Sequence, residues 1–154
     1  MQKGAIGGVV GAVLLIAIAL AVAGCGGGGG DSSTTALTKA QYVKQANAIC
    51  KKGQQEREAA VNELAEEVKP GANAGELPKA GLVEAVTPPL AAMVEELAAL
   101  PAPEGDEAEV EALVEAYEKP VEEIEEDQNA VFEGELFKEA DAKSVKYGLE
   151  DCVL

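Results

Sequence analysis

Apolar and small side chains recur every three or four residues in four separate stretches of the chain, which is the spacing of amphipathic helices. The first stretch predicts a helix over residues 38–68, and Thr38 with Gln41 has the spacing of a capping box at its start. Asp106 with Glu109 has the same spacing at the start of the third stretch. The other three helices are predicted over residues 78–100, 106–128 and 135–147.

Prolines interrupt two of these stretches. Pro88 and Pro89 lie in the second, and Thr87 before them resembles a new N-cap, so a kink or a break is expected there. Pro120 lies in the third stretch, which is expected to be kinked or to restart at that point.

Gly148 suits a left-handed stop after the fourth helix. Four apolar-striped helices with short loops predict an all-α fold, a compact antiparallel four-helix bundle.

The first 24 residues have a different pattern. A single lysine, Lys3, precedes an almost wholly apolar run from Gly4 to Gly24, as in export signals. The run is also long enough to cross a bilayer as an uncleaved helix, and this alternative stays open.

The sequence VAGC at residues 22–25 resembles the lipobox of bacterial lipoproteins, in which the signal is cut before the cysteine and the cysteine is acylated. This resemblance implies that residues 1–24 are a signal peptide and that Cys25 is the lipidation site. Residues 25–36 are then a glycine-rich tether with a root-mean-square span of roughly 17 to 20 Å. The domain, residues 37–154, is expected at the extracytoplasmic face of the cell membrane.

Two further cysteines lie in the domain, Cys50 in the first helix and Cys152 after the fourth. Outside the cytoplasm, two such thiols in a small domain most often form a disulfide. The alternative is two separate buried thiols. A redox-catalytic pair is disfavoured, because the chain has no Cys-x-x-Cys spacing.

Charge and composition exclude several classes of function. Removing residues 1–24 changes the formal net charge from −16 to about −17, which argues against nucleic acid and anionic lipid surfaces as partners. The absence of histidine removes Ser-His and Cys-His nucleophilic pairs and His-containing zinc or di-iron sites. We assign no catalytic residue, cofactor or metal site and expect a protein that is not an enzyme. With few aromatics the core is expected to be aliphatic, with Tyr42, Tyr117 and Tyr147 in it or at its rim.

Three sets of polar side chains are candidates for binding a ligand or for a structural contact. The third helix carries a row of carboxylates, which could bind calcium, although we expect a solvated face because no calcium-loop pattern accompanies it. Asn47, beside the apolar face of the first helix, is expected to form a structural hydrogen bond. Arg57, the sole arginine, is expected to pair with a glutamate at the edge of the core. The row of carboxylates consists of Glu107, Glu111, Glu115, Glu118, Glu122 and Glu125.

Three stretches resemble a known group of proteins: LTKAQYVKQANAIC from residue 37, LAALPAPEGDEAEVEALVEA from residue 97 and the closing KYGLEDC from residue 146. They are similar to small secreted lipoproteins of actinobacteria, in which a signal and lipobox precede an all-helical domain that ends in a Tyr-Gly…Cys segment. The resemblance implies export, the helical fold and a disulfide between Cys50 and Cys152. It implies no particular activity.

These observations predict a non-enzymatic interaction or accessory module of the cell envelope. Its expected partners are the membrane, through the lipid anchor, and an envelope protein. The alternative is a lipoprotein that binds a small molecule or a divalent cation where Pro88 and Pro120 open the bundle. An exposed apolar patch would favour the first function, and a pocket with a few convergent polar groups would favour the second.

Overall fold

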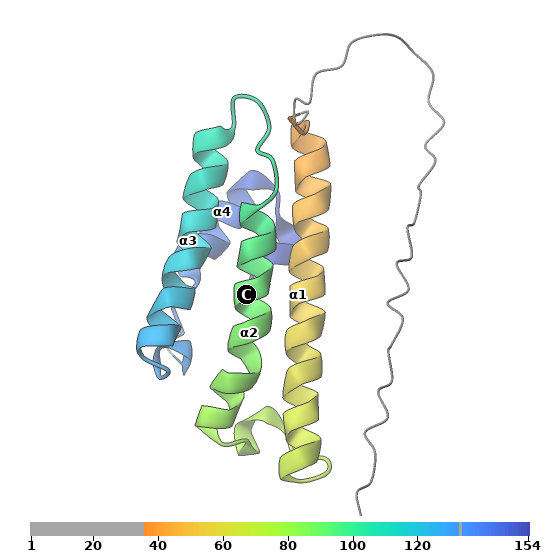
Figure 1. Cartoon of the computed structure of the whole chain (residues 1–154), viewed down its shortest axis with the longest axis vertical. Coiled ribbons are helices and arrows are strands. Elements are labelled where there is room, and N and C mark those ends of the chain that lie inside the picture. The colour runs from red at the N-terminus through yellow and green to blue at the C-terminus, as the bar shows by residue number, and fades with distance from the viewer. Residues whose placement is uncertain (1–35, 133) are drawn as a thin grey trace, which may run out of the picture. The chain divides into compact units, whose positions relative to one another are not determined.

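The computed structural model describes residues 36–132 and 134–154, in which every regular element is a helix (Figure 1). The predicted signal peptide and Cys25 lie outside these residues. The four α-helices and the all-α fold are confirmed. The α-helices are α1 (Lys39–Val68), α2 (Lys79–Ala98), α3 (Glu107–Glu126) and α4 (Lys138–Tyr147); three short 3₁₀ turns are η1 (Ala74–Glu76), η2 (Ala130–Phe132) and η3 (Glu150–Cys152).

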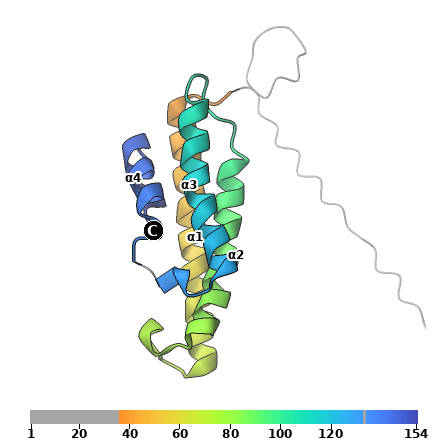
Figure 2. The ribbon, with the colours of Figure 1, turned by 90° about the vertical axis from the view of Figure 1, so that its left-hand side faces the viewer.

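Successive helices of the bundle are antiparallel. α1, α2 and α3 run alternately up and down in Figure 1. Tyr147 at the end of α4 contacts Lys39 and Asp106 at the starts of α1 and α3, so α4 is antiparallel to both of those helices. Figure 2 shows α4 and the C-terminal residues on one side of the three longer helices.

The capping box predicted for the first helix is confirmed. The Thr38 side-chain oxygen accepts from the Gln41 backbone N–H at 3.3 Å, and the Gln41 side chain accepts from the Thr38 backbone N–H at 2.9 Å. Two of the N–H groups that a helix start leaves without a backbone partner are thereby satisfied.

The break expected near Thr87 is absent, because α2 continues through Pro88 and Pro89. Thr87 does not act as a new N-cap: its hydroxyl donates to the carbonyl of Val83 at 2.8 Å, one turn back in the same helix. Val83 before the prolines and Leu90 after them are both buried, and this shared packing offsets the missing backbone donors. α3 likewise continues through Pro120 without restarting.

The core is aliphatic with tyrosine at its centre, as the composition predicts. Its largest fully buried side chains come from α1, α2, α3 and the segment after α4: Tyr42, Tyr117, Leu97, Leu113, Ile124 and Leu149.

Gly148 ends α4 with a φ of 95°, and the backbone N–H of Leu149 donates to the carbonyl of Ser144 at 2.8 Å. This is the predicted left-handed stop.

Helix α2 packs tightly against α1 at Gly53. A Cβ at this buried position would lie 2.8 Å from the Met93 Cβ and 2.9 Å from the Met93 Cγ. Gly81, which also faces the α1–α2 contact, has room: a Cβ there would lie 3.4 Å from a methyl carbon of Leu64. A residue without a Cβ is therefore required at position 53 but not at position 81.

We predict opposite effects for alanine at these two helical glycines. Gly53→Ala gains helix propensity but forces Met93 and its helix to shift, so the free energy of unfolding should fall by about 1–2 kcal/mol. Gly81→Ala should raise it by about 0.5–1 kcal/mol. Thermal and denaturant unfolding measure both variants, and equal stability of the two would contradict the close approach.

Candidate ligand-binding groove

A disulfide joins the end of the chain to the middle of α1. Cys50 and Cys152 are both fully buried, and their Cα atoms lie 4.9 Å apart, within the usual range for a disulfide. The pairing expected from the sequence is thus confirmed. The two residues are 102 positions apart, and in the chain-entropy view closing a loop of that length stabilises a domain by up to about 4.7 kcal/mol.

Two amide side chains of α1 bind the backbone on either side of that bond. Asn47 donates to the Gly148 carbonyl at 3.3 Å and accepts from the Asp151 N–H at 2.9 Å, which confirms its predicted structural role. Gln54 donates to the carbonyls of Asp151 at 2.7 Å and Val153 at 3.2 Å. We call this set, Asn47, Cys50, Gln54 and η3, the C-terminal clamp.

Tyr117 of α3 holds the same segment from the other side. Its hydroxyl donates to the Cys152 carbonyl at 2.6 Å, so the hydroxyl of Ser144, also at 2.6 Å, is the donor in their contact. Burial raises the pKa of Tyr117 to about 12. Helices α1, α3 and α4 therefore meet at the last residues of the chain.

The other two tyrosines form a second cluster at the start of the bundle. The ring of Tyr147 packs edge-on against that of Tyr42, with centroids 5.7 Å apart. Its hydroxyl donates to Asp106 at 2.8 Å, and Lys39 lies 3.1 Å from the same carboxylate oxygen. The Tyr147 hydroxyl and Lys39 lower the pKa of Asp106, whereas burial raises the pKa of Tyr42 and, together with Asp106, that of Tyr147.

Asp106 consequently does not have the role expected of it. Its side chain makes no capping hydrogen bond at the start of α3, so the second cap pair predicted from the sequence is wrong. The carboxylate instead accepts from Tyr147, which lies 41 residues further along the chain.

All three tyrosines of the chain should ionise at a higher pH in the folded protein than in the unfolded one. Each has a raised pKa, so the folded state favours the neutral phenol, and this contribution to stability is present below about pH 10 and is lost as the pH rises toward 12. Tyrosinate absorbance measured against pH, with and without denaturant, tests this expectation. Tyr117→Phe should remove the part of the rise that lies near pH 12, and superimposable curves would contradict the burial.

The glutamate row of α3 is a solvated face, as expected. All six carboxylates are exposed. Four of them, together with Leu100 and Val114, border an open hollow of about 610 Å³ beside the end of α2. In residues 36–132 and 134–154, no group of three or more His, Cys, Asp or Glu side chains is arranged to hold a metal ion.

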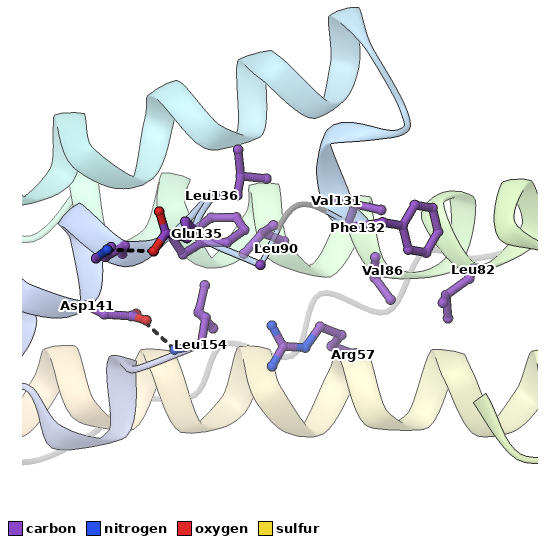
Figure 3. A pocket seen from close by; sticks show the side chains of 13 residues that line it. Arg57, Leu82, Val86, Leu90, Val131, Phe132, Glu135, Leu136, Asp141 and Leu154 are labelled. Atoms are coloured by element: carbon purple, nitrogen blue, oxygen red, sulfur yellow. Dashed lines mark hydrogen bonds and ion pairs between the residues drawn. The ribbon is translucent and has the colours of Figure 1, made fainter. Parts of the chain in front are cut away.

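A more apolar groove, of about 660 Å³, lies between α1, α2 and the segment that leads into α4. We call it the α2 groove (Figure 3). Eight apolar side chains line it together with Gly134 and four ionic ones, and its volume is within the range of small-molecule sites. The apolar side chains are Leu82, Val86, Leu90, Val131, Phe132, Leu136, Phe137 and Leu154; the ionic ones are Arg57, Glu135, Lys138 and Asp141.

The ionic side chains of the α2 groove differ in how they are paired. Asp141 accepts from the Leu154 N–H at 3.0 Å, and Glu135 lies 2.6 Å from the Lys138 ammonium nitrogen. Arg57 makes no ion pair with any residue that the structure describes, so its expected pairing with a core-edge glutamate is not observed there. The guanidinium is partly buried at the wall of the groove.

The position of the groove matches only half of the site suggested by the prolines. Leu82, Val86 and Leu90 flank Pro88 on α2, but Pro120 does not line the groove. The apolar pair Val131–Phe132, in a segment without helical spacing, indicates a segment that packs on the bundle but does not indicate which helix it faces. Phe132 is 39% exposed at one end of the groove, and the Lys79 ammonium lies 4.8 Å from its ring centroid.

Comparisons of the chain with protein-family models, curated proteins and solved structures find no match. Within the described part of the chain, none of the helices combines the length and apolar character needed to cross a membrane.

Proposed function

We propose that this protein is a non-enzymatic binding module of the cell envelope, anchored by lipid at Cys25, and that it binds a small molecule in the α2 groove. The groove is the observation that supports binding: apolar walls from three parts of the chain, a few polar groups at one side and a volume of about 660 Å³. The lipobox resemblance at residues 22–25 and the short tether support the anchor and the extracytoplasmic location.

The described surface favours a small-molecule ligand over a flat protein interface. Its large, exposed apolar side chains are Val68 in α1, Phe132 in η2, Val145 in α4 and Val153 after η3. Single exposed residues of this kind are ordinary on soluble proteins, whereas a partner site is marked by a contiguous patch. An envelope protein therefore remains the second candidate, and a divalent cation has less support than a small molecule.

The anchor is tested by the intact mass of the wild-type protein purified from the membrane. We expect a chain that starts at Cys25 and carries added acyl mass, because cleavage and acylation both require this cysteine. Cys25→Ser should retain residues 1–24 and carry no acyl group. A wild-type protein that retains residues 1–24 without acyl mass would instead show an uncleaved membrane anchor.

The binding function is tested by filling the groove. Val86 is partly buried in the groove wall, so Val86→Trp should occupy the space of a ligand. Val145, on the exposed face of α4 and 62% exposed, provides the matched control Val145→Trp. We expect mass spectrometry of the full chain, purified from the envelope, to find a small molecule with the wild type and with Val145→Trp but not with Val86→Trp. The same compounds in all three samples would contradict binding in the groove.

A further inference from the structure

We propose that the α2 groove binds a monocarboxylic acid with one alkyl chain, with the carboxylate on Arg57 and the chain along α2 toward Phe132. This inference rests on the proposed function and specifies its ligand.

Arg57 lies at the wall of the α2 groove, beside the C-terminal residues. Arg57 follows Gln54 by three residues on α1, so the two side chains share one face of the helix. Gln54 binds the carbonyls of Asp151 and Val153, which brings Leu154 beside Arg57. Figure 3 shows the guanidinium of Arg57 pointing toward Leu154, which lies beside it on the α1 side of the groove.

The α2 groove contains one ionic side chain without a counter-ion among the described residues. Two of the four ionic side chains that line the groove are positive and two are negative, although the chain as a whole carries −16. Asp141 is engaged by the Leu154 N–H and Glu135 by Lys138. Among the described residues Arg57 alone of the four lacks a partner, and a guanidinium stays charged at all relevant pH values. A ligand carboxylate would supply the missing counter-ion in the two-pronged geometry that arginine favours.

The lining and the volume of the α2 groove limit the ligand to one negative charge and one alkyl chain. A second negative charge on the ligand would find no further unpaired cation among the lining side chains that the structure describes, because Lys138 already pairs with Glu135. A volume of about 660 Å³ suits a drug-sized ligand and therefore a single chain better than the two chains of a bilayer phospholipid. The chain would lie against Val86, Leu82 and the exposed ring of Phe132, which form the apolar length of the groove.

The test uses the full chain in phospholipid nanodiscs and two photoreactive probes. One is a saturated fatty acid that carries a diazirine on its chain, and the other is the fatty alcohol of the same length with the same diazirine. Mass spectrometry of the digested protein locates the labelled residues. We expect the acid to label the groove residues of α2 and the segment around Phe132, and to label them more strongly than the alcohol does.

Variants of Arg57 separate the charge from the apolar groove. Arg57→Met should lower labelling by the acid about tenfold, the size expected for one charge-assisted contact at a partly exposed site, and leave labelling by the alcohol unchanged. Arg57→Lys, which keeps the charge, should restore part of the acid labelling. Lys51→Met, which removes a charge from an exposed position on the same helix, should behave like the wild type. Thermal unfolding confirms that each variant is folded.

The outcomes distinguish this inference from the proposed function. Equal labelling of the groove by both probes, or acid labelling that Arg57→Met does not change, overturns the acid ligand and leaves small-molecule binding in place. Absence of label from the groove with both probes overturns the alkyl ligand as well. In that case the compounds that co-purify with the wild type and are lost from Val86→Trp decide whether the groove binds anything at all.

Discussion

The attachment of the last residues to α1 is the constraint on which the rest of the bundle depends. α4 is only 10 residues long, and a helix of that length is marginal on its own in water. It is held at its end by the C-terminal clamp and, about one turn earlier, by the hydrogen bond between Ser144 and Tyr117. The disulfide, two amide side chains and one buried phenol thus hold the fourth helix against the bundle. The first three helices are held there by longer apolar faces.

The same arrangement explains why a groove exists. α4 begins at Lys138, three residues later than the periodic pattern suggests, so the described residues between α3 and α4 contain one short 3₁₀ turn, η2, and no longer helix. This segment brings Phe132 and Phe137 opposite α2 but does not fill the space between them. Because the clamp fixes the end of the chain beside α1, Leu154 becomes part of the lining of the groove.

Much of the fold could be predicted from the sequence because its signals are local. Helical spacing, the capping box at Thr38 and the glycine stop at Gly148 each depend on residues within one or two turns of one another. The expectations that failed depend on distant residues. α2 continues through Pro88 because Val83 and Leu90 are buried in a core that side chains of α1 and α3 complete. Asp106 does not cap α3 because its carboxylate accepts a hydrogen bond from the Tyr147 hydroxyl of α4.

The candidate site was harder to predict than the fold for the same reason. Cys50 and Cys152 were identifiable because cysteines in an exported chain have few alternatives. The role of Arg57 was not, since a lone arginine on a helix gives no indication of which acids lie within its reach. The segment around Phe132 lacks any periodic pattern that could have placed it opposite α2.

The disulfide also has a consequence for the order in which the domain is made. If the chain is exported from its N-terminus, as the lipobox resemblance implies, Cys50 would reach the outside long before Cys152, which follows it by 102 residues. During that interval the thiol of Cys50 would lack its partner in the folded protein, and α1 would have no C-terminal residues to bind. Lipid attachment at Cys25 would remove the one other thiol that could capture Cys50 in the meantime. The domain would then cross the membrane unfolded, and the bond that closes it would be among the last to form.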